Sequence, residues 1–354
     1  MRLEQKHCLS MAIMAALWLL TCGDVHAERS DRSGGGTVVT ESGDQIRIEN
    51  ATLQAVIRKR GYVSGVAESS FLDKKTGFHD PGFGLEIVDW LMEPGSDEAY
   101  RAQLTGDMPY EFHNLTHGNR AKRTIEGPEI CTQAREVLPE LIHGKDFVAV
   151  RTRFRYRLAA PGKKTGSEWE QTLVFPEGKR YFLASERILS VNSSPAMFLR
   201  LDMPGHIKHH GADTFSEVYL SYHGRILASE FANDFAPDTK FLYVRNDRRL
   251  PKRLIRAYHL RDAQTGKDGP WLAGMTLDPS VVSEAWCHQR GYVCMIEEIG
   301  GRPIEPGQTI EAAFLVGYFD SIAEMNRVYD QYAGHTALTV DDTAWRLLRP
   351  TPEH

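Results

Sequence analysis

Hydrophobic and polar positions alternate with a period of two along most of the chain beyond residue 37. Val218, Leu220 and Tyr222, for example, alternate with Tyr219 and Ser221. Because successive side chains of a strand point to opposite faces, this pattern predicts half-buried strands joined by turns. The expected strands are 45–59, 61–72, 84–91, 110–112, 147–158, 168–175, 181–191, 197–203, 217–222, 241–245, 254–260, 271–277, 283–298 and 309–319.

A single segment near the C-terminus has the period of a helix. Ser321 and Glu324 form a capping box at its start, and Gly334 is placed to end it. Its expected apolar face consists of Ile322, Met325, Val328, Tyr329 and Tyr332. A parallel sheet needs a helix between successive strands, which this chain lacks. We therefore predict an all-β fold, a large antiparallel two-sheet sandwich with one C-terminal helix, in a single domain over 37–350.

The first 27 residues have the pattern of an export signal. Arg2 and Lys6 precede an apolar run at 11–20, and small residues follow where signal peptidase cleaves. This run is too short for a membrane span, which needs about twenty residues. Cys22 ends a motif that resembles a lipoprotein signal, which is the alternative. We expect an exported protein, periplasmic or secreted, with a flexible tether at 28–36.

The net charge and the motifs of the chain exclude some classes of binding partner. A formal net charge of −5 without a basic run is a poor match for nucleic acid, and no later apolar run is long enough to span a membrane. The chain shows no metal motif, so we expect no cofactor. Calcium remains possible, because the side-chain oxygens of Asn233-Asp-Phe-Ala-Pro-Asp238 could bind the ion. The alternative for this stretch is an ordinary turn.

Two cysteines flank a predicted hairpin turn. If Arg290 and Gly291 form that turn, Cys287 and Cys294 lie directly opposite each other. In the oxidising compartment that an export signal implies, this arrangement predicts a disulfide. Zinc binding by this pair is disfavoured, because zinc sites usually bring two ligands three to five residues apart.

Four arginines share one face of a predicted strand: Arg151, Arg153, Arg155 and Arg157. Their guanidinium groups could follow the charges of an acidic polysaccharide. The alternative is a charge ladder across the hairpin, in which Arg157 faces Glu168 and Arg155 faces Glu170. Arg151 and Arg153 have no evident acidic partner, so we take them as candidate ligand-binding residues.

The stretch 206–224 concentrates groups that transfer protons. The candidate catalytic residues there are His209, His210, Glu217, Tyr219 and His223, and His206 is a candidate substrate-binding residue. The alternation predicts that Glu217, Tyr219 and His223 face a cleft, whereas Val218, Leu220 and Tyr222 face the core. For any single histidine here, a structural role is the alternative.

Two further clusters are candidate substrate-binding sites. The first is a predicted loop with His113, Asn114 and His117, whose alternative is a surface histidine pair. The second is the predicted hairpin with Trp286, His288, Arg290 and Tyr292. Aromatic rings beside polar groups suit sugars, although these aromatics could equally belong to the core.

Several stretches resemble the galactose-mutarotase-like superfamily, whose fold is a β-supersandwich. They are Asn50-Ala-Thr-Leu-Gln-Ala-Val-Ile-Arg-Lys59, Phe71-Leu-Asp-Lys-Lys-Thr-Gly77, the segment 169–182 and Phe314-Leu-Val-Gly-Tyr-Phe319. The resemblance implies a carbohydrate ligand. We expect a polysaccharide lyase that acts on an acidic, uronate-containing glycan. The alternatives are an aldose 1-epimerase-like or glycoside-cleaving enzyme that uses Glu217 with a histidine, and a non-catalytic glycan-binding module.

Overall fold

The computed structural model describes residues 29–32, 36–61, 64–96, 98–99, 101–103, 121–127, 134, 136–231, 240–289 and 292–350. Several predictions concern residues outside this part: the export signal, His113, Asn114, His117, the stretch 233–238 and Arg290. Among the described residues, no helix is both long and apolar enough to cross a bilayer.

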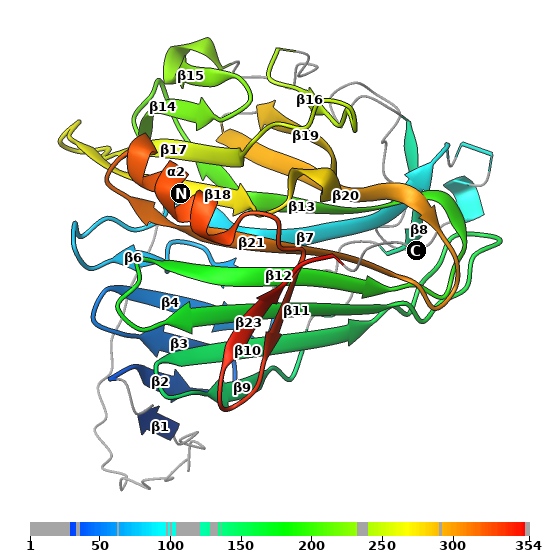
Figure 1. Ribbon diagram of the computed structural model, residues 1–354, viewed down its shortest axis with the longest axis horizontal. Helices are drawn as coiled ribbons and strands as arrows, with labels where there is room; N and C mark the ends of the chain where they lie inside the picture. Colours follow the sequence, from blue (N-terminus) through cyan, green and yellow to red (C-terminus); the bar gives the residue numbers. More distant parts are fainter. Residues whose placement is uncertain are drawn as a thin grey trace, which may run out of the picture.

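The largest sheet has nine antiparallel strands. They are β9 (Glu140–His143), β10 (Phe147–Arg155), β11 (Glu168–Pro176), β12 (Tyr181–Leu189), β14 (Phe215–Leu220), β15 (Gly224–Leu227), β17 (Leu254–Arg261), β18 (Asp268–Thr276) and β21 (Thr309–Phe319). Their spatial order is β15-β14-β17-β18-β21-β12-β11-β10-β9 (Figure 1). Strands far apart in the sequence, such as β12 and β21, are therefore neighbours.

A second sheet has seven strands. They are β5 (Val66–Ala67), β7 (Gly82–Pro94), β8 (Lys122–Glu126), β13 (Ser194–Lys208), β16 (Tyr243–Val244), β19 (Val282–Gln289) and β20 (Tyr292–Ile304). The order is β16-β19-β20-β13-β7-β5, and β8 also pairs with β7. A smaller sheet contains β1 (Arg29–Arg32), β2 (Val38–Glu41), β3 (Gln45–Glu49), β4 (Leu53–Arg58) and β6 (Leu72–Asp73).

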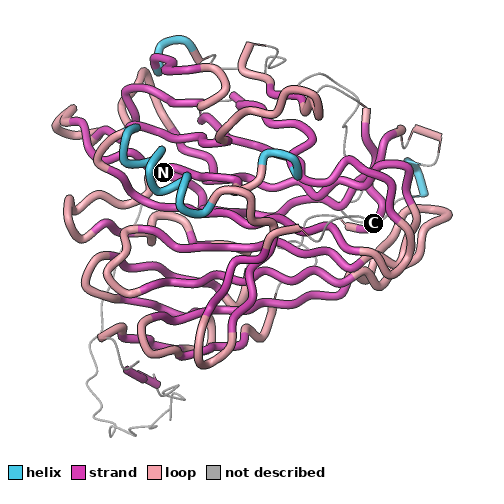
Figure 2. The backbone as a smooth tube through the Cα atoms, viewed as in Figure 1, coloured by secondary structure: helices cyan, strands magenta, loops and turns pink. Residues whose placement is uncertain are grey.

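The sheets enclose one main hydrophobic core, and the chain is an all-β sandwich as predicted (Figure 2). Alternate residues of each strand enter this core, as period-two patterning requires. Leu199 and Leu201 of β13 and Val218 and Leu220 of β14 are examples, and Tyr222 packs against the same cluster. The predicted core side of the stretch 218–222 is therefore confirmed.

Two elements cover the opposite face of the nine-stranded sheet. Helix α2 (Ile322–Tyr332) contacts β18 and β21, and the hairpin of β22 (Ala337–Val340) and β23 (Trp345–Leu348) lies across β12 and its neighbours (Figure 1). The Ser321 hydroxyl accepts a hydrogen bond from the Glu324 amide at 3.2 Å, so the predicted helix start is confirmed. A second hydrophobic cluster fills this layer.

Some predicted boundaries differ from the structure. Residues 29–32 of the expected tether form β1, which pairs with β2. The expected strand 283–298 is two strands, β19 and β20, and 45–59 is likewise two. Residues 50–52 separate β3 from β4, where the alternation gave no break, whereas β19 and β20 end and begin on either side of the expected turn at Arg290 and Gly291.

The interior of the sandwich holds charged residues that alternation alone does not predict. Glu86, Glu186, Glu297 and Arg256 are all fully or almost fully buried between the sheets. Burial raises the pKa of Glu86 well above its ordinary value, and the charges of Glu186 and Glu297 add to this. Burial also raises the pKa of Glu186 to about 8, although Gln171 and Trp169 donate hydrogen bonds to its carboxyl group.

Candidate functional site

A bulge in β13 brings two polar side chains together on the outer face of the seven-stranded sheet, the face turned away from the nine-stranded sheet. Asp202 lies opposite Ile296, and His206 lies opposite Cys294, so four steps along β13 match two along β20. The extra residues form the bulge, which shortens the distance between positions 202 and 206. Their side chains therefore meet instead of lying about 13 Å apart, as four steps of regular strand would place them.

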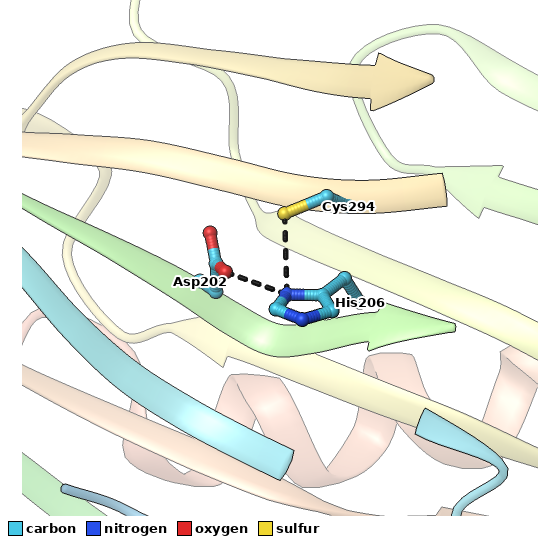
Figure 3. Close-up of side chains that lie close together, drawn as sticks. All are labelled: Asp202, His206 and Cys294. Carbon is cyan, nitrogen blue, oxygen red and sulfur yellow. Dashed lines mark hydrogen bonds and ion pairs between the residues drawn. The ribbon is translucent and has the colours of Figure 1, made fainter. Parts of the chain in front are cut away.

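Three side chains meet at this bulge (Figure 3). Asp202 Oδ2 lies 2.7 Å from His206 Nδ1, and Cys294 Sγ lies 3.5 Å from the same nitrogen. Asp202 and Cys294 are buried, whereas His206 keeps 16% of its side chain exposed. Both contacts use Nδ1, so the three residues cannot relay a proton from thiol through imidazole to carboxylate, which requires both ring nitrogens.

The Asp202 contact assigns the histidine tautomer. When Nδ1 carries the proton and donates it to the Asp202 carboxylate, Nε2 is left as the nitrogen that can accept a proton. A carboxylate that holds an imidazole in one orientation in this way is a usual arrangement for general acid–base catalysis. His206 is thus both oriented and partly exposed.

His206 opens onto a pocket of about 290 Å³, lined by Arg58, Ala67, Glu68, Phe83 and His206 itself. The His206 ring centroid lies 4.5 Å from that of Phe83 and 5.5 Å from that of Tyr292. The ammonium group of Lys208 lies 4.0 Å from the centroid of the Phe83 ring. The pocket therefore combines an aromatic ring, one cation, one carboxylate and one oriented imidazole, and Lys208 places a second cation on the Phe83 ring.

The same outer face continues into a buried ionic cluster. Glu298 contacts Arg200 at 2.6 Å and Lys122 at 2.8 Å, and all three side chains are almost fully buried. Trp286 lies beneath the Arg200 guanidinium, 5.0 Å from it. His288 lies opposite Cys294 in the pairing of β19 with β20. The charged groups of this cluster pair with one another, and the cluster lies next to the His206 pocket.

Four of the predicted substrate-binding residues lie on this face: His206, Trp286, His288 and Tyr292. Of these, Trp286 is packed in a small hydrophobic cluster with Cys294 and Ile296, which agrees with the alternative of a core aromatic. The rings of His206 and Tyr292 lie 5.5 Å apart, and His206 lines the pocket.

Glu217 and Tyr219 lie on the outer face of the nine-stranded sheet, away from the His206 pocket. Tyr219 packs against the cluster beneath α2. Glu217 is bound by Arg225 through two hydrogen bonds of 2.5 and 2.6 Å and lies 3.2 Å from His259 Nδ1. The Arg225 guanidinium lowers the pKa of Glu217. The sequence had suggested a histidine from 206–223 as the partner of Glu217, and the structure gives His259 instead.

The remaining candidate histidines lie apart from one another. His209 is buried against Phe215, and burial lowers its pKa. His210 and His223 are exposed, and the ring of His223 contacts Phe241. The structure thus does not bring the five candidate catalytic residues into one site.

The arginine row is a charge ladder, shifted by one pair from the predicted register. Arg155 pairs with Glu168, and Arg153 pairs with Glu170 at 2.6 Å. Arg151 pairs with Glu140 at 3.0 Å, so the expectation that Arg151 and Arg153 lack acidic partners is wrong. Glu140 lies on β9, a strand that the sequence pattern did not predict, and β10 ends at Arg155, three residues earlier than expected.

The predicted disulfide is not formed between the two described cysteines. Cys294 lies opposite His288, and Cys287 lies opposite Met295. Because this register differs by one residue from the predicted one, the two side chains point to opposite faces of the sheet. Cys287 enters the main core, whereas Cys294 joins the outer face.

Sequence reasoning gave no role to Arg58, Glu68 and Phe83, which line the pocket, or to Asp202, which contacts His206, and it assigned Cys294 to a disulfide. The first three come from the N-terminal third of the chain, and only strand pairing brings them to His206. The expected strand ended at residue 203, so the alternation did not pair Asp202 with His206.

No protein-family model matches the chain, and no curated protein matches its sequence. Similar solved structures include a galactose mutarotase-like protein from Clostridium acetobutylicum, with 10% identity, 84% of this chain and 99% of that chain covered, and a TM-score of 0.45. A galactose 1-epimerase from Lactobacillus acidophilus has 8% identity, coverage of 84% and 98%, and a TM-score of 0.44. A heparan sulfate lyase from Pedobacter heparinus has 11% identity, coverage of 82% and 36%, and a TM-score of 0.37.

These proteins are of the kind that the sequence resemblance named. At such identities and scores the likeness is loose. The functional argument therefore rests on the side chains of this chain.

Proposed function

We propose that this chain is a carbohydrate-active enzyme, and that its active site is the pocket at His206. The observation that carries the proposal is the His206 imidazole, which Asp202 orients at 2.7 Å beside the aromatic rings of Phe83 and Tyr292. Apolar sugar faces stack on such rings, and an oriented imidazole can move a proton of the bound sugar.

The reaction that these groups support best is β-elimination on a uronate-containing glycan. Arg58 and Lys208 place two positive charges around Phe83, where a sugar carboxylate would need neutralisation. His206 Nε2 then accepts the C5 proton, the C4–O4 bond breaks, and a C4–C5 double bond forms. The Tyr292 hydroxyl is the proposed donor of the proton that the leaving oxygen takes up.

A second candidate, an aldose 1-epimerase-like reaction, is favoured by Glu68. This carboxylate lines the same pocket as His206. An epimerase needs a carboxylate to accept the proton of the anomeric hydroxyl and a histidine to protonate the ring oxygen. Glu68 already forms an ion pair with Arg58, at 3.9 Å, which is why we place this reaction second.

Product formation on a panel of uronate polysaccharides tests the proposal, because β-elimination creates a double bond that absorbs ultraviolet light. We expect absorbance to rise with the wild-type protein and His206→Gln to lower the rate by about 10²–10⁴-fold. Tyr292→Phe should lower the rate without abolishing binding.

The matched control is His259→Gln on the nine-stranded sheet, which changes a histidine that also contacts a carboxylate. It should leave the rate within about twofold, since His259 lies outside the pocket. If His206→Gln retains full activity, the site assignment fails. If no uronate polysaccharide yields absorbance, the lyase reaction fails, and polarimetry on free aldoses with Glu68→Gln then tests the epimerase.

We also propose that residues 1–27 direct export and are removed. The support is the basic start followed by a short apolar run. N-terminal sequencing of the protein recovered from its host should begin near residue 28, and a start at Met1 would contradict this.

A further inference from the structure

We propose that Asp202, His206 and Cys294 form a binding site for a divalent transition ion of the zinc class, and that the ion switches the His206 site off. The three side chains offer a carboxylate oxygen, an imidazole nitrogen and a sulfur atom within 4.8 Å of one another. The part that concerns activity rests on the proposed function, whereas ion binding does not.

The donor set selects the class of ion. Thiolate and imidazole are ligands that zinc and its neighbours prefer, whereas calcium and magnesium take oxygen ligands almost throughout. Cys294 and Asp202 are buried, and His206 reaches the pocket through which an ion can enter. An ion here would meet partly desolvated ligands, which strengthens their interaction with its charge.

The distances fit a tetrahedral ion with small movements. Bond lengths of about 2.0 Å to nitrogen and 2.3 Å to sulfur imply a nitrogen–sulfur separation of about 3.5 Å at a tetrahedral angle. The observed separation of Cys294 Sγ from His206 Nδ1 is 3.5 Å. The Asp202 contact of 2.7 Å is a hydrogen bond and must open by about 0.6 Å, which a small rotation about its side-chain bonds provides.

A second observation points to a ligand. Asp202 Oδ1 is buried and has no hydrogen-bond partner within the described part of the chain. Buried carboxylate oxygens without partners are costly, and a cation bound between Asp202 and its neighbours would offset that cost. The bulge of β13 therefore holds a buried carboxylate to which the described part of the chain gives only one hydrogen-bond partner.

Ion binding and proton transfer at His206 exclude each other. An ion on Nδ1 takes the place of the proton that Nδ1 shares with Asp202, and the neutral ring then carries its proton on Nε2. Nε2 can then donate a proton but can no longer accept one. Occupancy of the site thus removes the base that the pocket needs.

Cobalt binding to the untagged full-length protein, pre-treated with a chelator, tests the site without any assay of activity. We expect one equivalent of Co²⁺ to produce the near-ultraviolet thiolate-to-cobalt absorption band. Cys294→Ser should abolish the band and weaken Zn²⁺ binding, measured by competition with a chromophoric chelator, by at least about tenfold. Asp202→Asn and His206→Gln should weaken Zn²⁺ binding as well.

Cys287→Ser is the matched control, because Cys287 lies on the adjacent strand of the same hairpin and points into the core. The band and the Zn²⁺ affinity should persist in this variant. A band that survives Cys294→Ser, or no thiolate band at all, would overturn the site.

Zinc inhibition completes the test. Saturating Zn²⁺ should lower wild-type polysaccharide cleavage by about 10²-fold or more, and the same Zn²⁺ concentration should have less effect on Cys294→Ser, each relative to its own metal-free rate. Activation by zinc would overturn the inhibitory role. Cobalt binding without any cleavage would defeat the proposed function and leave the site, whereas His206-dependent cleavage without cobalt binding would defeat the site alone.

Discussion

The two outer faces of the sandwich hold their charged residues in different ways. On the nine-stranded sheet, Arg153 and Arg155 each face a glutamate in an exposed ladder, and Glu217 is enclosed by Arg225 and His259. On the seven-stranded sheet the ions are buried, and next to them lies the His206 imidazole, whose Nδ1 contacts Asp202.

On the nine-stranded sheet the charged residues pair with one another, whereas the face of the seven-stranded sheet can still bind a ligand. A charge ladder satisfies its members through their neighbours, so little is left to recognise a ligand. At the His206 pocket, in contrast, an oriented ring nitrogen, an aromatic surface and cations lie together with space beside them. The chemistry is expected where polar and aromatic groups line an open pocket, not where the charges are most numerous.

The largest expected contrast is in stability. Glu298→Gln removes the anion that Arg200 and Lys122 share in a buried setting, so it should lower the free energy of unfolding by about 3–5 kcal/mol. The same change at Glu168, which meets Arg155 on the exposed ladder, should cost less than about 0.5 kcal/mol. Urea unfolding of both variants measures the difference, and equal losses would contradict the distinction between the faces.

The second contrast is in ligand binding. Arg58→Ala removes a cation that lines the pocket and lies 3.9 Å from its partner Glu68, so it should weaken binding of an acidic oligosaccharide by about tenfold or more, as for a hydrogen bond to a charged group. Arg153→Ala removes a cation that Glu170 already pairs, so affinity should change by less than about threefold. Isothermal titration calorimetry compares the two variants. A larger loss for Arg153→Ala would restore the arginine row as the binding surface.

The sequence pattern predicted which residues of a strand share a face, but not which other element covers that face. Alternation correctly separated Val218 and Leu220 from Glu217 and Tyr219. Nothing in that alternation says that the polar side lies beneath α2, because a strand's period is the same whichever neighbour it packs against. Strand pairing over long distances decides this, and a single sequence does not reveal it.

Register explains the other differences. The observed pairing of β19 with β20 differs by one residue from the predicted pairing, so Cys287 and Cys294 lie on opposite faces of the sheet. The bulge that joins Asp202 to His206 is likewise a local irregularity, without which the two would not touch. The candidate site was thus predictable for His206 and Tyr292 and not for the residues that orient and surround them.

The last contrast is in the pH dependence of stability. Burial and two neighbouring carboxyl groups raise the pKa of Glu86, so the folded protein retains a proton that the unfolded chain loses above about pH 4.5. Stability from this group is therefore present below that pH and is lost as pH rises. Glu217 has a lowered pKa beside Arg225, so its contribution is present above that pH and is lost as pH falls.

Two matched substitutions test the opposite pH dependences that Glu86 and Glu217 give to the stability. Glu86→Gln should become more stable relative to the wild type between pH 5 and pH 8, by at most about 1.4 kcal/mol per pH unit, because one proton is at stake. Glu217→Gln should lose stability relative to the wild type at pH 7 and approach it at pH 4. Urea midpoints across this range give the slopes. Parallel curves for Glu86→Gln and the wild type would show that Glu86 titrates alike in the folded and unfolded chain, and its burial would then not govern its ionisation.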